Sequence, residues 1–327
     1  MVVLLYKTIM NKNDKIYIAG HNGLVGSAIL RKLKSLGYNN IIAKAHKDLD
    51  LINQSAVDDF FKNEKPDYIF LAAAKVGGIG ANSTYPAEFI YQNTMIGFNI
   101  IHASYKYNVK KLLNLGSSCI YPKFSPQPLK EEYLLSGSLE STNDAYAIAK
   151  ISTIKLCYSY NKQYGTNFIS AMPANLYGPN DTYDTENGHV LPSLIRKFHE
   201  AKTNGTNKVI LWGDGSPRRE FLYSDDLADA IVFLMLNKDF SEIGEFINIG
   251  TGVDITINEL AEIIKKTIYF DSPEVNCRIE WDTNKPNGTP QKLLDISKMN
   301  SFGWKAHTDL FIGIKKVYNN FIKNFII

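Results

Sequence analysis

The sequence is poor in cysteine, almost neutral in charge and without a long hydrophobic run. Its 327 residues include only Cys119, Cys157 and Cys277, which lie far apart and show no CxxC spacing. This usage argues against a disulfide framework and against a zinc site, and it is typical of reduced thiols in a cytoplasmic protein. We therefore expect a cytoplasmic protein without a metal cofactor.

The balance of charges excludes a further class of protein. The chain has 36 basic and 33 acidic residues, a net charge of +3, and no basic block, so nucleic-acid binding has no electrostatic support. The opening VVLLY (residues 2–6) is too short to span a membrane and lacks the flanks of a signal peptide. We expect no membrane association, and we interpret residues 1–13 as a poorly ordered leader.

From residue 15 the chain alternates short apolar runs with helical patterns. The runs predict strands over 15–20, 39–44, 67–74, 111–118 and 167–173, and the patterns predict helices over 24–36, 53–63, 86–106 and 143–164. Strands that are apolar throughout and alternate with helices are typical of a parallel sheet covered on both faces. We therefore predict an α/β protein with a doubly wound, Rossmann-type sheet.

After Pro173 the pattern changes to loops rich in Asn, Gly, Asp and Pro with shorter elements between them. Thr256 and Glu259 form a predicted capping box at the start of a helix over 257–270. We expect a smaller α/β lobe over the C-terminal edge of the sheet, where such folds bind ligands. The predicted domains are a Rossmann domain at 14–175 plus about 219–250, and a substrate domain at 176–218 and 251–327.

The sequence GHNGLVG (20–26) joins the first predicted strand to the first predicted helix. Glycines at such a turn let backbone N–H groups approach a pyrophosphate and let the helix pack closely on the strand. A glycine triplet alone is a weak signal, because any strand-to-helix turn tolerates glycine. Its place at the start of a βαβ series favours dinucleotide binding by Gly20, Asn22, Gly23, Leu24, Val25 and Gly26.

The end of the second predicted strand bears on the choice between NADP and NAD, because residues there contact the adenosine ribose. Lys44, His46 and Lys47 would surround a 2′-phosphate, which favours NADP. Asp48 would instead hold the ribose of NAD, and a solvated charged loop is the third interpretation.

Tyr146 and Lys150 are four residues apart in a predicted helix and so lie on one face of it. A phenol has an ordinary pKa of about 10, and we expect the adjacent ammonium to lower it by favouring the phenolate. The spacing alone occurs by chance in many helices. Together with Ser117 at the end of the fourth predicted strand, it indicates carbonyl reduction, in which Tyr146 supplies a proton and NAD(P)H a hydride.

With these residues the chain resembles the extended short-chain dehydrogenase/reductases and, among them, the GDP-L-fucose synthases. The similarity runs over essentially the whole chain from Lys15. It rests on GHNGLVGSAI (20–29), LAAAKVGGI (71–79), IYQN (90–93), GSSCIYP (116–122), YAIAK (146–150), NLYGP (175–179), HVLP (189–192), REFLY (219–223) and KPNGTPQKLLD (285–295).

The resemblance implies a homodimer that uses NADPH to epimerise C3 and C5 and to reduce C4 of a GDP-linked 4-keto-6-deoxy sugar, giving GDP-L-fucose or a close relative. It implies a role for residues in each part of the site. Ser117, Tyr146 and Lys150 would be the reductase triad, and Cys119 and His189 the epimerisation acid/base pair. Ala73 and Asn175 would join residues 20–26, Ser117, Tyr146 and Lys150 at the cofactor, and Lys197, Trp212, Arg219 and Lys292 would contact the GDP-sugar.

The chemistry of a 4-keto sugar agrees with that grouping. C3 and C5 are both α to the carbonyl, so one oxyanion site built by Ser117 and Tyr146 can stabilise both enolates and then the reduction. A thiol with a reference pKa of about 8.5 and an imidazole of about 6.5 can both exchange protons near neutrality. Non-catalytic interpretations also exist: Cys119 would be a small buried hydrophobe, and His189 an exposed loop residue.

The sequence departs from the family at two positions. Asn22 and His46 stand where many members carry arginines for the 2′-phosphate, although Lys44 and Lys47 would compensate. Two other functions stay open. One is a C4 reductase without epimerase activity on another GDP-4-keto sugar, such as a GDP-heptose, and the other is a non-catalytic nucleotide-binding protein.

Overall fold

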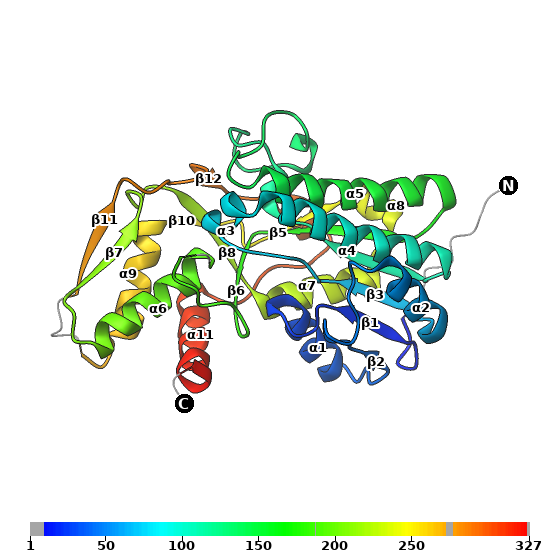
Figure 1. The fold of residues 1–327 in the computed structure, drawn as a ribbon, viewed down its shortest axis with the longest axis horizontal. Helices are drawn as coiled ribbons and strands as arrows, with labels where there is room; N and C mark the ends of the chain where they lie inside the picture. Colours follow the sequence, from blue (N-terminus) through cyan, green and yellow to red (C-terminus); the bar gives the residue numbers. More distant parts are fainter. Residues whose placement is uncertain (1–9, 187, 273–276, 326–327) are drawn as a thin grey trace.

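The computed structural model describes residues 10–186, 188–272 and 277–325, and its main sheet has six parallel strands (Figure 1). Their order is β2-β1-β3-β4-β5-β9. The strands are β1 (Ile16–Ala19), β2 (Ile41–Ile42), β3 (Tyr68–Leu71), β4 (Lys111–Leu115), β5 (Phe168–Pro173) and β9 (Ile247–Ile249). The predicted doubly wound parallel sheet is confirmed, and the order in which the chain adds its strands reverses between β1 and β3, where ligands bind in this architecture.

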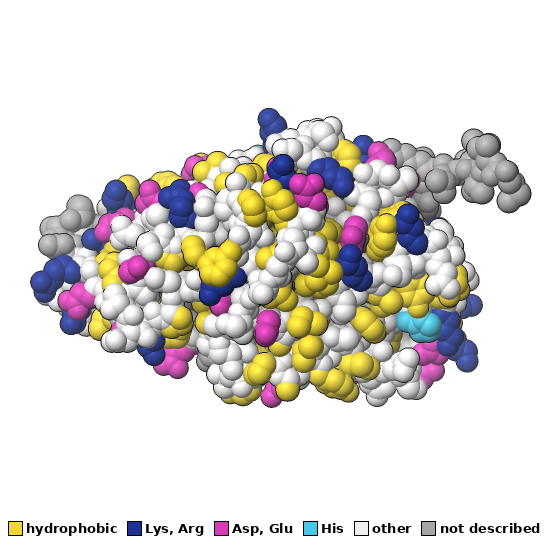
Figure 2. Space-filling view, turned by 90° about the horizontal axis from the view of Figure 1, so that it is seen from above, with side chains coloured by type: hydrophobic (Ala, Val, Ile, Leu, Met, Phe, Trp, Pro, Cys, Tyr) yellow, Lys and Arg dark blue, Asp and Glu magenta, His cyan; other side chains and the backbone are white. Residues whose placement is uncertain are grey.

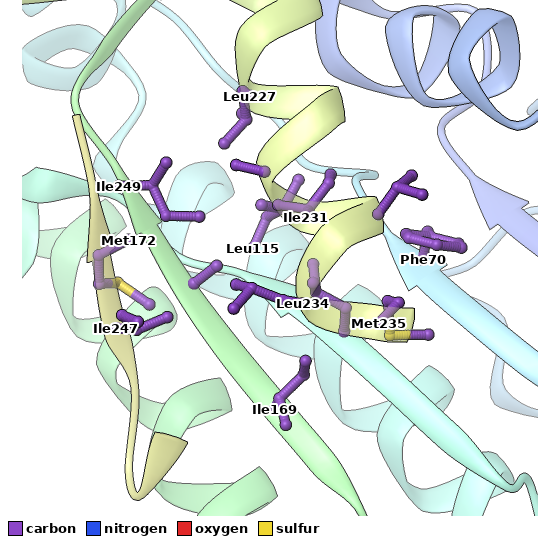
Figure 3. Close-up of a cluster of buried hydrophobic side chains, with 14 of the residues drawn as sticks. Phe70, Leu115, Ile169, Met172, Leu227, Ile231, Leu234, Met235, Ile247 and Ile249 are labelled. Carbon is purple, nitrogen blue, oxygen red and sulfur yellow. The ribbon is translucent and has the colours of Figure 1, made fainter. Parts of the chain in front are cut away.

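Alternate residues of each central strand enter different hydrophobic clusters, which explains why these strands are apolar throughout. Phe70 and Leu115 belong to the cluster beneath α7, whereas Ile69 and Leu112 belong to the cluster on the opposite face. Figure 3 shows the first of these clusters, with Ile231 of α7 among the labelled side chains. Both faces of the sheet are therefore buried, as the sequence pattern predicted.

The helices around this sheet keep close to their predicted bounds. α1 (Leu24–Ser35) and α7 (Ser224–Asn237) pack together, as do α4 (Pro86–Lys106) and α5 (Asp144–Tyr164), on the other side of the sheet (Figure 1). The remaining elements of this half are α2 (Gln54–Glu64), α3 (Ile79–Thr84), α8 (Phe240–Ile243), α10 (Ser297–Ser301) and the 3-10 helices η1 (Ser118–Ile120) and η2 (Glu131–Tyr133).

The second half of the chain builds two smaller sheets around a core of its own. The larger one contains β10 (Asp254–Thr256), β8 (Arg218–Tyr223), β12 (Gln291–Lys292) and β6 (Asn175–Tyr177), and the smaller one pairs β7 (Lys208–Trp212) with β11 (Arg278–Asp282). α6 (Val190–Thr203), α9 (Ile257–Ile268) and α11 (Leu310–Phe325) complete this half. The predicted capping box of α9 is confirmed, because Thr256 and Glu259 each bond the backbone N–H of the other.

Three details differ from the sequence-based expectations. β2 is only two residues long, because the chain pairs with β1 only at Ile41 and Ile42. In the predicted leader, residues 1–9 lie outside the described residues, but Met10 is buried and its carbonyl accepts from the Tyr38 hydroxyl. Residues 219–250 were predicted to return to the Rossmann domain. In this segment β9 belongs to the main sheet and α7 packs against it, whereas β8 lies in the second sheet. The domain division itself stays a prediction.

No helix within the described ranges is both long and apolar enough to span a membrane.

Candidate active site

A single cavity of about 810 Å³ extends from the glycine loop to strands β7, β8 and β12. It lies where β1, β3 and β4 end, and loops from the second half of the chain close its other side. Most of the predicted site residues line it: Gly20, Asn22, Gly23, Leu24, Val25, Lys44, His46, Ala73, Ser117, Cys119, Tyr146, Asn175, His189, Lys197, Trp212, Arg219 and Lys292. Gly26, Lys47 and Lys150 are outside this wall.

The glycine loop packs tightly against the protein at Gly20 and Gly26, and it leaves space beside Gly23. A Cβ on Gly26 would lie 2.1 Å from the Gly20 carbonyl oxygen, and one on Gly20, whose φ is +85°, would lie 2.8 Å from Ala73 Cα. A Cβ on Gly23 would meet only the Gly20 oxygen, at 3.5 Å. Gly23 is also the N-cap of α1, so unpaired N–H groups of the first turn open toward the cavity. This loop fits the pyrophosphate of a dinucleotide.

The loop after β2 brings two of the three predicted cations to the cavity. Lys44 Nζ lies 3.6 Å from Glu64 Oε1, and the exposed His46 lies 3.8 Å from Asp50 Oδ1. Lys47 is exposed to solvent and away from the wall, and so is Asp48, the alternative ligand for an NAD ribose. Lys44 and His46 can therefore reach a 2′-phosphate from the cavity wall, which they share with the Asp50 carboxylate.

Ser117 and Tyr146 come together from two elements. Ser117 follows β4 as the N-cap of η1, and its Oγ accepts from the Cys119 N–H at 3.3 Å. Tyr146 lies in the first turn of α5. Burial raises the pKa of Tyr146 and the neighbouring Cys119 adds to this, while a hydrogen bond with Ser117 opposes it. The phenol is therefore protonated at neutral pH, as a proton donor must be.

Lys150 lies behind Tyr146 and is almost completely buried. Its Nζ donates to the Leu115 carbonyl at 2.8 Å and lies 5.8 Å from the centre of the Tyr146 ring. Burial lowers the pKa of Lys150 to about 8. Our expectation that this ammonium lowers the pKa of Tyr146 is wrong, because desolvation of the phenol dominates at this site.

Cys119 accepts two hydrogen bonds through its sulfur. Asn143 Nδ2 and Lys292 Nζ each lie 3.5 Å from Sγ. Burial alone would raise the pKa of Cys119, but the Lys292 charge, bonds from Ser117 and Lys292, and the Arg219 charge together lower it below the ordinary value. Cys157 behaves as a buried hydrophobe instead: it is 0% exposed, and burial raises its pKa to about 12.

His189 is the N-cap residue of α6 and opens onto the same cavity. The residue is exposed to solvent, and it forms part of the cavity wall. Burial lowers the pKa of His189, and the Lys292 charge lowers it further. The imidazole is thus more readily neutral than a free one.

The far end of the cavity carries cations and an indole. Lys197 Nζ and Lys285 Nζ lie 6.0 and 5.0 Å from the Trp212 ring centre. Arg219 and Lys292 are neighbours across the β8–β12 pairing. An indole beside cations suits a nucleoside diphosphate, because the ring can stack on a base and the cations can bind phosphate oxygens.

Two polar residues stand out among those of this wall that sequence reasoning missed. Asn143 donates to Cys119, and the signal for it was its position three residues before Tyr146, which places both near one helix face. Asp181 is 8% exposed, and its Oδ2 has no hydrogen-bond partner among the described residues. Burial raises the pKa of Asp181 to about 7. No pattern in its polar loop indicates that burial.

Comparison with known proteins agrees with this architecture. The model of the NAD-dependent epimerase/dehydratase family matches residues 16–250. GDP-L-fucose synthase 1 of Arabidopsis thaliana is 54% identical over 96% of this chain and 95% of its own, and GDP-L-fucose synthase of Escherichia coli (strain K12) is 48% identical over 95% and 97%. A GDP-mannoheptose C4 reductase of Campylobacter jejuni, solved with NADP bound, superposes with a TM-score of 0.86 at 43% identity and covers 95% of this chain and 99% of its own.

Proposed function

The chain belongs to the NAD-dependent epimerase/dehydratase family and, within it, to the GDP-L-fucose synthases, and on that premise we propose that it makes GDP-L-fucose from GDP-4-keto-6-deoxymannose with NADPH. Two steps are required, epimerisation at C3 and C5 and reduction at C4. The observation that carries this proposal is that Ser117, Cys119, Tyr146 and His189 open onto one cavity. One bound sugar can therefore meet both sets of groups.

The residues of the cofactor end fit NADPH. The glycine loop and the N-terminus of α1 would hold its pyrophosphate, and Lys44 and His46 would face its 2′-phosphate. When bound, NADPH supplies the hydride that reduces the C4 carbonyl. A cofactor of this type is also present in the Campylobacter jejuni reductase.

Reduction depends on Ser117 and Tyr146. Both would hydrogen-bond the C4 carbonyl oxygen, and the protonated phenol would give its proton to that oxygen as negative charge develops. Lys150, fixed on the Leu115 carbonyl, holds positive charge near this site below a pH of about 8.

Epimerisation depends on Cys119 and His189. The Cys119 thiolate would remove the proton from C3 or C5, and the resulting enolate would be stabilised by Ser117 and Tyr146 at O4. His189, in its protonated form, would return a proton to the opposite face of the carbon, and its lowered pKa makes the imidazolium a stronger acid. Reduction at C4 then removes the ketone that acidified both positions, which fixes the new stereochemistry.

Incubation of the purified protein with GDP-4-keto-6-deoxymannose and NADPH tests the proposal. Loss of NADPH absorbance should accompany formation of GDP-L-fucose, identified by chromatography and NMR. Absence of turnover with this sugar and with a panel of other GDP-4-keto sugars would contradict the proposal.

A C4 reductase without epimerase activity is the second candidate, favoured by the likeness to the GDP-mannoheptose C4 reductase. The two candidates differ in solvent exchange. In deuterated water an epimerase places deuterium at C3 and C5 of the product, whereas a reductase alone leaves both carbons unlabelled. Cys119→Ser should abolish the label under the first proposal while the protein remains folded.

We further propose that the enzyme is a homodimer joined through α4 and α5. These helices lie side by side and expose Tyr91 (59%), Phe98 (37%), Ile148 (47%) and Tyr164 (49%). Figure 2 views the molecule from this side, and hydrophobic side chains cover much of the middle of the face. Pairing two such faces would remove these four side chains from solvent.

We also place the enzyme in the cytoplasm, on the state of its thiols. Cys119, Cys157 and Cys277 are all free. A catalytic Cys119 must stay reduced, and cytoplasmic reductants maintain that state. Cell fractionation with immunodetection tests this location, and recovery from an oxidising compartment would contradict it.

A further inference from the structure

Lys292 contacts a reacting atom, although sequence analysis placed it only among the residues that contact the GDP-sugar. Its Nζ donates to Cys119 Sγ at 3.5 Å, across 173 residues of chain. The ammonium therefore contacts the sulfur in the protein without bound substrate. A neutral thiol is a weak acceptor, and an ammonium in contact with sulfur favours the thiolate.

The backbone holds Lys292 in this position from both sides. On one side β12 pairs in parallel with β8, with Lys292 opposite Arg219. Glu220 of β8, which is 1% exposed, accepts from the Leu294 N–H at 2.9 Å. On the other side the Leu293 N–H donates to Gln127 Oε1 at 2.9 Å. The lysine is thus built into a fixed strand, unlike an exposed lysine that samples many positions.

Other charged and titratable groups face Cys119 from each neighbouring element. Arg219 comes from β8 and Tyr146 from α5, and both interact electrostatically with the thiol. Glu140 acts on Arg219 and on Lys292, and His189 of α6 is under the influence of Lys292. Of these groups, Lys292 is the charged one with a hydrogen bond to the sulfur among the described residues.

We propose that Lys292 is the cation that keeps Cys119 as a thiolate in the free enzyme, with Asn143 as the second donor to the sulfur. This inference rests on the proposed function for its consequence in catalysis. The thiol proton leaves to solvent, and the thiolate then accepts the proton from C3 or C5 while the C–H electron pair passes into the enolate. Lys292 acts through Cys119 and is a positioning residue for the epimerisation.

The pKa shifts of the site agree with this geometry. Burial would raise the pKa of Cys119, yet Lys292 is the largest of the influences that lower it. A lowered pKa increases the fraction of thiolate at neutral pH, and that fraction falls as the pH falls. Removing the ammonium leaves burial dominant, so the pKa of Cys119 should then rise.

The rate of Cys119 alkylation by iodoacetamide against pH tests the proposal without any substrate. Intact-mass spectrometry follows the reaction, and Cys157 and Cys277, both 0% exposed, should stay unmodified. Lys292→Met should raise the midpoint of the pH profile by about 1–3 pH units. Lys292→Arg should keep a low midpoint. Lys208→Met is the matched control, because it removes an exposed lysine that pairs with Glu280 and does not line the cavity.

A midpoint that is the same in Lys292→Met as in the wild-type protein would overturn the proposal. If Lys292→Met fails to fold by circular dichroism, the thiolate absorbance near 240 nm of the wild-type protein decides instead. This absorbance should disappear in Cys119→Ser and should titrate below the ordinary pKa of about 8.5; a midpoint at or above that value also overturns the proposal. Neither readout uses a GDP-sugar, so failure of the proposed function would be seen separately.

Kinetics distinguish activation of Cys119 from simple substrate binding. Lys292→Met should reduce kcat for deuterium incorporation at C3 and C5, and raising the pH should restore part of it. An increase in KM alone, with kcat for exchange unchanged, would mean that Lys292 only binds the sugar and would overturn the proposal.

Discussion

Asp181 and Tyr146 line the same cavity, and burial raises the pKa of both acids. The consequences differ, because the ordinary pKa of a phenol is already far above neutrality whereas that of a carboxyl is far below it. For Tyr146 the shift only secures the protonated form. For Asp181 the shift brings titration to about pH 7, where it affects the stability of the protein.

We expect Asp181→Asn to change how stability depends on pH. The folded-state pKa of about 7 exceeds the ordinary 3.8, so the folded protein binds more protons between these values. The contribution of Asp181 to stability is then present below about pH 4 and is lost as the pH rises through 7. Relative to wild type, the variant should gain about 2–4 kcal/mol between pH 4 and pH 8 in urea unfolding.

The exposed Asp48→Asn provides the control for that experiment. If Asp181→Asn and wild type show parallel stability profiles from pH 4 to 8, Asp181 is not a buried carboxyl of raised pKa.

Tyr146→Phe should remove the proton donor and leave the packing of the ring intact. The ring makes an edge contact with Phe89 that phenylalanine preserves. We expect NADPH oxidation to fall by a factor of about 10²–10⁴ with an unchanged melting temperature. Tyr85→Phe, which alters an exposed tyrosine, should keep the wild-type rate. Wild-type turnover in Tyr146→Phe would show that Tyr146 is not the proton donor.

At the scale of elements, Lys111 closes the C-terminal end of α7. The residue begins β4 and is 1% exposed, and its Nζ donates to the carbonyls of Leu234, Met235 and Lys238 at 3.1, 2.9 and 2.6 Å. The last carbonyls of a helix have no partner within it, and the helix dipole makes them attractive to a cation. One side chain of the sheet thereby fixes the helix that covers it.

Lys111→Met should therefore destabilise the fold by about 2–4 kcal/mol, because three carbonyls lose a buried charged donor. Urea unfolding followed by circular dichroism measures this loss. Lys110→Met removes the neighbouring lysine, whose partly exposed ammonium pairs with Asp14 and Asp67, and should cost about 1 kcal/mol or less. Equal effects of the two variants would contradict a special role for Lys111.

Elements set by residues close together in the sequence could be predicted, whereas those set by contacts between distant segments could not. α4 begins at Pro86 and ends at Lys106 as predicted, since proline fixes the first turn and the apolar pattern continues to the end. β2 is shorter than predicted, because a strand is defined by pairing with its neighbour and only Ile41 and Ile42 pair with β1. Within the site, Ser117, Cys119 and Tyr146 carry local motifs. The contact of Lys292 with Cys119 joins residues that no local pattern connects.

At the scale of the whole molecule, the exposed face of α4 and α5 should decide the oligomeric state. A dimer would have twice the 36.8 kDa mass of the chain, measurable by light scattering after gel filtration. Phe98→Asp should shift the protein toward monomer, because burial of a charge in an apolar interface is unfavourable. Phe124→Asp is the control, since Phe124 is 81% exposed and outside both helices. A monomeric wild-type protein would exclude the dimer.

The separation of Cys119 and Lys292 in the sequence has a consequence for the synthesis and folding of the protein. During synthesis the thiol leaves the ribosome long before its ammonium partner, and β12 reaches its place only when β8 is already formed. Until then Cys119 is an ordinary thiol that oxidants and electrophiles attack slowly at neutral pH. With Lys292 in its proposed role, the reactive thiolate arises only in the finished molecule, where it lies in the wall of the cavity, so the nascent chain is spared premature alkylation or oxidation.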